Sequence, residues 1–105
     1  MSKTKFVLTP NPTFKATVMI PVPGESAAPV EFTFKHKTRD QYNEYMASIE
    51  GKSYAEIVMD IASGWDLSDP FDKDSIEKMT QNYIGSGMVV FDTYVQELTA
   101  ARTKN

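Results

Sequence analysis

Two stretches in the first third of the chain alternate between apolar and polar residues. The first places four apolar residues on one face: Phe14, Ala16, Val18 and Ile20. The second does the same with Val30, Phe32 and Phe34. A period of two is the signature of a half-buried β-strand, and the proline-rich residues 21–29 between the two stretches indicate a connecting loop. We therefore predict an antiparallel hairpin with a nine-residue loop, whose apolar face helices must cover.

After residue 37 the apolar spacing becomes helical. Three segments begin at a residue suited to cap a helix, and two of these, Thr38 with Gln41 and Ser53 with Glu56, have capping-box spacing. The third cap is Asp72. The apolar side chains of the three segments are Tyr42, Tyr45, Met46 and Ile49; Tyr54, Ile57, Val58 and Ile61; and Ile76, Met79 and Tyr83. We expect Gly51 to end the first helix and Gly64 to end the second.

A fourth helix is predicted from about Gly87 to Arg102, after a joint at residues 85–87. Its main apolar stripe is Met88, Phe91, Val95 and Leu98. Three further apolar residues lie outside that stripe: Val89, Val90 and Tyr94. The apolar arc is therefore wider than one ordinary core face, so this helix is either central to the domain or in contact with another copy or a partner.

Together the elements predict an α+β fold, in which an antiparallel β-hairpin packs on a bundle of about four α-helices. The length of 105 residues suits one domain with a modest core. Pro10 and Pro12 break regular pairing, so residues 1–12 are expected to form an extended or disordered arm. Residues 13–100 then form a single α+β domain and residues 101–105 a polar C-terminal tail.

The charge divides along the chain. Residues 1–39 contain six Lys or Arg against two Glu, and residues 40–105 contain five against twelve acidic residues. An acidic helical part argues against a nucleic-acid surface there. The basic part either contacts an acidic partner or is a solvated face. With no cysteine, no signal-like segment and no apolar run of membrane length, we expect a soluble, intracellular protein that binds no membrane.

Candidate chemistry is sparse. His36 is the only histidine, and no motif surrounds it, so a residue at the rim of a strand is the simpler interpretation. A hydrolase or metal enzyme built on His36 would require a cleft there. Asp66, Asp72, Asp74 and Glu77 have the spacing of calcium-loop ligands, but Pro70 and Phe71 occupy positions that need an oxygen ligand and a glycine. We predict no enzyme, no metal site and no cofactor.

The residues 64–72 hold the only tryptophan, Trp65. They combine an expected helix stop, a large aromatic residue and the cap Asp72. We therefore interpret them as a structural junction, in which Trp65 packs between the helix pair and the next helix.

The order of motifs resembles the tail assembly chaperone family of long-tailed (siphovirus-type) bacteriophages. The residues that carry the resemblance are Ile57-Val58, Gly64-Trp65, Pro70-Phe71 with the cap Asp72, Tyr83-Ile84-Gly85, and Phe91 to Leu98. Together they span most of residues 14–98. Ile84 stands where the family often has a proline before the joint glycine.

This resemblance implies a non-catalytic chaperone that binds the tape measure protein, keeps it soluble and recruits tail tube subunits. It implies action in the host bacterial cytoplasm, absence from the mature virion, and a second product extended by ribosomal frameshifting. The polar residues 99–105 are consistent with the short product. The alternative is a small structural tail or head-completion component of the virion.

A chaperone for a long helical client needs exposed apolar surfaces. The expected partner contacts are Trp65, Phe71, Val90 and Tyr94. A homo-oligomer would allow many copies to coat one client.

Overall fold

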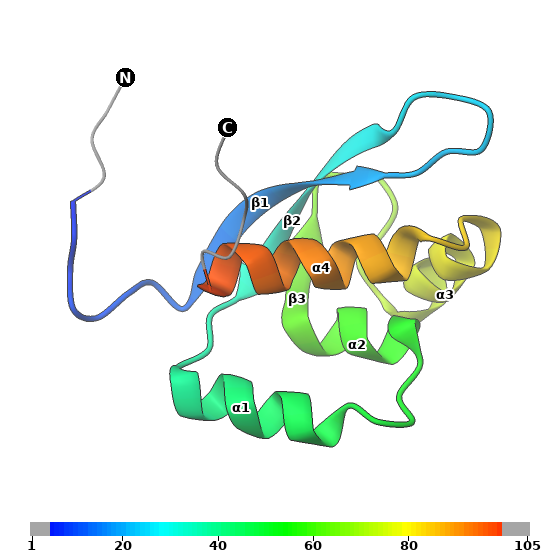
Figure 1. Ribbon diagram of the computed structural model, residues 1–105. Coiled ribbons are helices and arrows are strands. Elements are labelled where there is room, and N and C mark those ends of the chain that lie inside the picture. Colours follow the sequence, from blue (N-terminus) through cyan, green and yellow to red (C-terminus); the bar gives the residue numbers. More distant parts are fainter. Residues whose placement is uncertain (1–4, 100–105) are drawn as a thin grey trace.

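Residues 5–99, which the computed structural model describes, form three strands and four helices (Figure 1). Their order is β1 (Thr13–Ile20), β2 (Ala28–Lys35), α1 (Arg39–Ser48), α2 (Tyr54–Ile61), β3 (Ala62–Trp65), α3 (Lys73–Asn82) and α4 (Ser86–Thr99). The α+β fold, with a hairpin packed on four helices, is confirmed. The expected tail at 101–105 and the expected helix end at Arg102 lie outside the described residues, and the division into arm, domain and tail stays a prediction.

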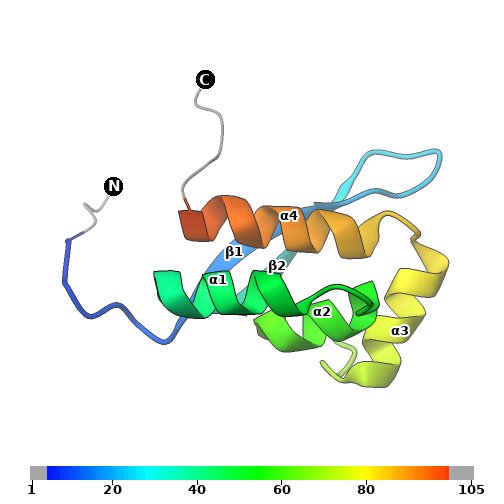
Figure 2. The same ribbon diagram turned by 60° about the horizontal axis from the view of Figure 1, so that its bottom comes forward.

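The hairpin is antiparallel and has the predicted apolar face. β1 and β2 pair antiparallel, with Phe14 opposite Phe34 and Val18 opposite Val30. Directly opposed residues point to the same side of a sheet, so the apolar side chains of both strands gather on one face. The helices lie on that side (Figures 1 and 2), whereas Lys15 on the other face is exposed. β2 begins at Ala28, so the connection is residues 21–27, shorter than the expected nine-residue loop.

Gly64 does not end a helix, contrary to the prediction. Helix α2 stops at Ile61, and Ala62 already has extended backbone angles. Residues 62–65 form β3, which completes the sheet in the order β1-β2-β3, with Trp65 opposite Phe32. The rings of this pair meet edge to face at 5.8 Å. Residues 62–65 therefore form a strand, because they pair with the free edge of β2 and Trp65 packs against the ring of Phe32.

The capping boxes are confirmed at both α1 and α2. At each start, the cap hydroxyl accepts a hydrogen bond from the third backbone N–H, and the third side chain accepts one from the cap N–H. After α1, Gly51 has a φ of +86°, a left-handed conformation that favours glycine. At the start of α3, the Asp72 carboxylate accepts a hydrogen bond from the backbone N–H of Ser75.

The predicted stripe of α4 is not its buried face. The residues of α4 that are fully buried are Ser86, Gly87, Val90 and Tyr94. Val90 and Tyr94 lie one turn apart, and the small residues Ser86 and Gly87 bring the start of the helix close to its neighbours. A Cβ on Gly87 would lie only 2.4 Å from the Cβ of Tyr54. Met88, which the predicted stripe would have buried, is half exposed.

Helix α4 is central to the domain, as one of the two interpretations required. It packs on β1, α2 and α3. The Tyr94 ring stacks on Phe14 at 6.1 Å, and its hydroxyl donates a 2.8 Å hydrogen bond to the carbonyl of Lys35. Burial raises the pKa of Tyr94 to about 12, with a smaller contribution from Tyr42. The aromatic core of the sheet is therefore closed by α4.

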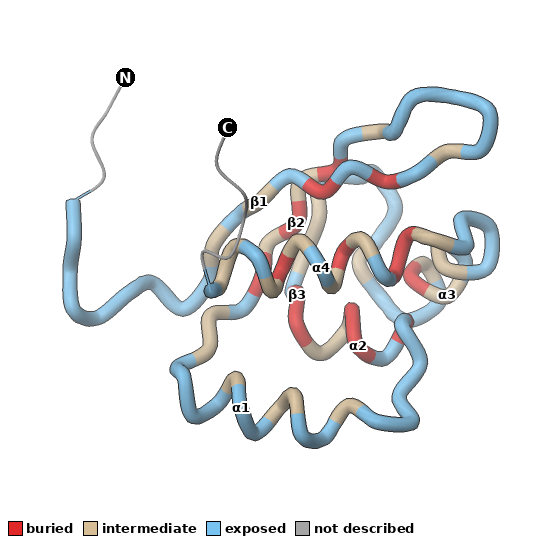
Figure 3. Tube along the Cα trace, viewed as in Figure 1, coloured by how far each residue is buried: buried red, intermediate tan, exposed pale blue. Residues whose placement is uncertain are grey.

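Helix α1 lies at the rim of this core, against which only Tyr45 and the C-cap residue Ile49 of its stripe pack. It contains no buried residue, and it takes little part in the packing that joins the other helices to the sheet. Figure 3 shows α1 with intermediate and exposed residues only. The apolar side chains of the predicted stripe are half-buried: Tyr42, Tyr45 and Met46 in α1, and Ile49 at its C-cap. The predicted amphipathic helix is present, but its apolar stripe is only partly covered.

Candidate partner-binding site

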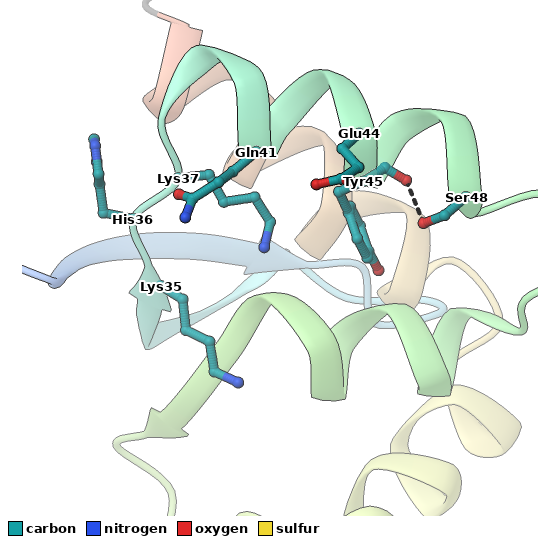
Figure 4. Close-up of a pocket in the computed structure, with 7 residues that line it drawn as sticks. All are labelled: Lys35, His36, Lys37, Gln41, Glu44, Tyr45 and Ser48. Carbon is teal, nitrogen blue, oxygen red and sulfur yellow. Dashed lines mark hydrogen bonds between the residues drawn. The ribbon is translucent and has the colours of Figure 1, made fainter.

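Surface hollows surround the connection between β2 and α1. One has a volume of about 400 Å³ and is lined by Lys35, His36, Lys37, Gln41, Glu44, Tyr45 and Ser48 (Figure 4). Another, of about 350 Å³, is lined by Lys37, Thr38, Arg39, Tyr42, Asn43, Leu98 and Thr99. The two meet at Lys37, and we call them together the α1 groove. A third hollow, of about 310 Å³, adjoins it through His36 and Leu98.

A small polar cluster ties α1 to α2. The Tyr45 hydroxyl donates a hydrogen bond of 2.9 Å to Asp60 Oδ2, and Lys52 Nζ forms an ion pair of 2.8 Å with the same oxygen. Lys37 Nζ lies 4.8 Å from the centre of the Tyr45 ring, which is a cation–π distance. Tyr45 therefore has a polar end fixed to Asp60 and a ring face covered by a lysine.

The electrostatics of this cluster favour a charged Asp60. Burial alone would raise the pKa of Asp60, but hydrogen bonds from Lys52 and Tyr45 outweigh it, and the pKa lies below its ordinary value of 3.8. Burial, followed by the hydrogen bond to Asp60, raises the pKa of Tyr45 well above its usual range. The tie is thus a hydrogen bond from a neutral phenol to a carboxylate, of the stronger, charge-assisted kind.

The α1 groove combines an aromatic wall with a basic rim. Tyr42 and Tyr45 present half-buried rings from α1, while Lys35, Lys37 and Arg39 supply positive charge along its length. Arg39 is almost fully exposed, with 88% of its side chain accessible. Glu44 lines the same groove and Asp40 lies 3.7 Å from Arg39, so these two carboxylates offset part of this charge. Such a surface can hold a helix or peptide that offers apolar side chains flanked by carboxylates.

A cleft does border His36, as a hydrolase or metal enzyme would require, but its side chains do not converge. Figure 4 shows the imidazole pointing away from Tyr45 and Ser48. The Ser48 hydroxyl donates a 2.7 Å hydrogen bond to the carbonyl of Tyr45 in its own helix. Among residues 5–99, no group of three His, Cys, Asp or Glu is placed to hold a metal ion. The hollow is better suited to binding than to catalysis.

Comparison with protein families gives a match over the whole chain. The family model described as phage tail assembly chaperone matches residues 1–105. The chain belongs to the phage tail assembly chaperone family. No match was found among curated proteins or among solved structures. The general role of the protein is therefore that of a chaperone in phage tail assembly, which agrees with the resemblance in its motifs.

Within the described residues of the chaperone, no helix has the length and apolar character needed to cross a membrane. Two of the expected partner contacts are partly exposed. The Trp65 and Phe71 rings meet edge to face at 5.1 Å, and the Trp65 indole N–H donates a 2.9 Å hydrogen bond to the Asp69 carbonyl. Both rings pack against the edge of the core, so they have one covered and one open side.

The other two expected contacts, Val90 and Tyr94, are core residues in the structure of the chaperone. A partner would reach them only if α4 moved away from the sheet, and their role in binding stays a prediction. The α1 groove itself was missed by the sequence analysis. Its signal was present in the basic run from Lys35 to Arg39, which directly precedes an aromatic helix stripe.

Proposed function

We propose that this chaperone binds the tape measure protein in the α1 groove and keeps it soluble during tail assembly. The observation that supports this proposal is the state of α1. The apolar side chains of its stripe are only half-covered, although the helix is well formed and capped at its start. An amphipathic helix without a complete apolar partner is suited to receive a client helix.

The positive charge of the α1 groove indicates which kind of client segment it would bind. Lys35, Lys37 and Arg39 line it, so a bound segment should carry acidic residues beside its apolar face. Opposite charges increase the rate of encounter and select among partners, more than they increase affinity. We therefore expect binding to acidic, amphipathic stretches of the tape measure protein, and weaker binding at high salt.

We further propose that the open sides of Trp65 and Phe71 contact tail tube subunits. These residues are not among those lining the α1 groove, so a client and a tube subunit could be held together. The proposal includes action in the host bacterial cytoplasm, absence from the mature virion, and a frameshift-extended second product. It also includes self-association on a long client.

Co-expression with the tape measure protein of the same phage tests client binding. We expect the chaperone to raise the soluble fraction of that protein and to co-purify with it. The triple charge reversal Lys35→Glu, Lys37→Glu and Arg39→Glu should weaken the complex at least tenfold. A control that reverses three lysines elsewhere, Lys15→Glu, Lys73→Glu and Lys78→Glu, changes the net charge equally and should leave the complex intact.

Two results would contradict the proposal. One is the absence of any complex with the tape measure protein at every ratio tested. The other is detection of the chain by mass spectrometry in purified virions at the copy number of a structural protein. That second result would favour the alternative, a tail or head-completion component.

A further inference from the structure

The two hollows of the α1 groove undercut α1 on neighbouring sides. The first is lined by residues of α1 that recur three and four positions apart, and therefore share one side of the helix: Gln41, Glu44, Tyr45 and Ser48. The second is lined by Tyr42 and Asn43, together with Leu98 of α4. Between the two hollows, Tyr45 and Ile49 pack against the core. The apolar contact between α1 and the domain is therefore a narrow line.

The hollows are too small to hold a client helix while α1 stays in place. Their volumes, about 400 and 350 Å³, lie near the lower end of the range for small-molecule pockets, which is about 300–1,000 Å³. An α-helix with its side chains is about 10 Å across, and two packed helices need about 8–10 Å between their axes. A client helix in this groove therefore requires α1 to move outward.

Tyr45 is the point at which polar contacts fasten α1. Its hydroxyl is bonded to Asp60 of α2, and its ring points from α1 toward α2 (Figure 4). Lys37 and Lys52 lie with Nζ 4.8 and 5.7 Å from the ring centre, one just before α1 and the other just after it. We call these four residues the Tyr45 cluster. Its contacts are partly exposed to solvent, so each is weak compared with a buried apolar contact.

The chain on both sides of α1 is suited to act as a hinge. Residues 36–38 and 49–53 contain no helix or strand, and Gly51 has a φ of +86°. The chain before the first hinge is fixed, because the His36 N–H donates a 2.9 Å hydrogen bond to the Pro12 carbonyl. The capping boxes at Thr38 and Ser53 each lie within one helix start, so α1 and α2 keep their ends when they separate.

The charges of the cluster favour opening by an acidic client. Asp60 holds Lys52 at 2.8 Å, while Lys37 lies over the Tyr45 ring. A carboxylate on a client helix can compete with Asp60 for Lys52, and with the ring for Lys37. The same charge that attracts the client thus weakens the contacts that hold α1 down.

We propose that α1 is a hinged lid, fastened in the free chaperone by the Tyr45 cluster, and that an acidic amphipathic helix opens it and is then held between α1 and the end of α4. Tyr42 and Tyr45 contact the client from the lid, and Leu98 contacts it from α4. This inference rests on the proposed function and deepens it, since it states how the α1 groove admits its client.

A removable cross-link tests whether α1 must open. The chain has no cysteine, so Tyr45→Cys with Asp60→Cys provides a unique pair of thiols in place of the hydrogen bond. A short bis-methanethiosulfonate joins them through disulfide bonds, and a reductant removes it. The probe is a set of overlapping labelled peptides that cover the tape measure protein of the same phage, and fluorescence anisotropy measures their binding.

We expect the cross-linked chaperone to bind the acidic amphipathic peptides at least tenfold more weakly than the same sample after reduction. The single variant Asp60→Cys, treated with the same reagent, forms no bridge and should bind equally before and after reduction. Asp60 does not line the α1 groove, so this control leaves the groove side chains intact. Circular dichroism checks the fold of each sample. Equal binding by the cross-linked and reduced forms would overturn the proposal.

Removing the Asp60 contact should have the opposite effect on binding. When only the open form accepts the client, the apparent affinity rises with the open fraction. We expect Asp60→Ala to bind the peptides about fivefold faster, the effect of losing one hydrogen bond. Asp74→Ala on α3 changes the net charge equally and should bind as the wild type does. An unchanged or slower association of Asp60→Ala would contradict the lid.

The lid and the proposed function can fail separately. In the free chaperone, the cross-link should slow hydrogen exchange of the α1 amides at least tenfold, and unchanged exchange would mean that α1 does not open. If the peptides bind the cross-linked and reduced forms equally, the lid is wrong and the proposed function stands. If no peptide binds the wild type, the reduced form or Asp60→Ala, the proposed function is wrong, whatever the exchange of α1 shows.

Discussion

The Tyr45 hydroxyl donates a 2.9 Å hydrogen bond to Asp60 Oδ2 and thereby ties α1 to α2. Lys52 shares the same carboxylate oxygen. Because α1 has no buried residue, polar contacts at its surface have an unusually large part in positioning it. The shape of the α1 groove therefore depends on one tyrosine and one aspartate.

The replacement Tyr45→Phe should loosen α1 without unfolding the domain. We expect a loss of about 1 kcal/mol in the free energy of unfolding, less than is usual for a hydrogen bond to a charged group because Asp60 is partly exposed. Hydrogen exchange of the α1 amides should accelerate more than exchange in α4. Tyr42→Phe removes a hydroxyl from the same helix and serves as the control. Equal exchange rates in both variants would show that the Tyr45 bond does not hold α1.

Lowering the pH should weaken the same hydrogen bond between Tyr45 and Asp60. The pKa of Asp60 is lower in the folded protein than its ordinary value of 3.8, so the folded state binds the proton less readily than the unfolded state. The stabilisation is therefore complete above the unfolded pKa and is lost as the pH falls through the folded one. In urea unfolding, the stability difference between the wild type and Asp60→Asn should be constant above about pH 5 and shrink below about pH 4. A difference that does not change with pH would contradict this account.

Because Gly87 lies directly against Tyr54, we predict that residue 87 tolerates no side chain. A Cβ at residue 87 would lie 2.4 Å from the Cβ of Tyr54, so Gly87→Ala must displace α2 or α4. We expect a loss of about 1–2 kcal/mol, although alanine favours a helix by about 1 kcal/mol over glycine. Gly85→Ala, whose new Cβ would meet Pro21 at an ordinary 3.6 Å, should be close to neutral. Thermal melts of both variants decide the matter, and equal losses would argue against the close contact.

Trp65 anchors the edge of the core rather than its centre. It contacts Phe32 and Phe71 edge to face and donates a hydrogen bond to Asp69. We expect Trp65→Ala to lower the free energy of unfolding by about 3 kcal/mol, the lower end for a large aromatic side chain. Trp65→Phe, which keeps a ring against Phe32, should lose less than half of that. A loss below about 1 kcal/mol for Trp65→Ala would mean that the indole serves a partner more than the core.

Features determined by short-range patterns were predictable. The hairpin followed from strict alternation, since each apolar residue of β1 has an apolar partner across the pair on β2. The capping boxes at Thr38 and Ser53 involve residues only three positions apart, so their sequences carry the whole signal. The cap at Asp72 was predictable for the same reason.

Features that depend on contacts between distant parts of the chain could not be predicted from the sequence. Residues 62–65 are a strand because β2 offers a free edge some thirty residues earlier in the chain, which no local pattern reveals. The buried face of α4 was predicted wrongly because that helix carries two apolar stripes. Which of the two is buried depends on the close packing of Gly87 against Tyr54. The incomplete burial of α1 was hidden because a half-covered aromatic stripe has the same spacing as a core face.

Hydrogen–deuterium exchange of the complex with the tape measure protein tests the central claim most directly. If the client lies in the α1 groove, the strongest protection on binding should fall on residues 36–49 and on the described end of α4 near Leu98. The open face of the sheet, including the residues around Lys15, should exchange as in the free chaperone. Protection confined to the sheet face or to the α3–α4 corner, with unchanged exchange in α1, would contradict the account.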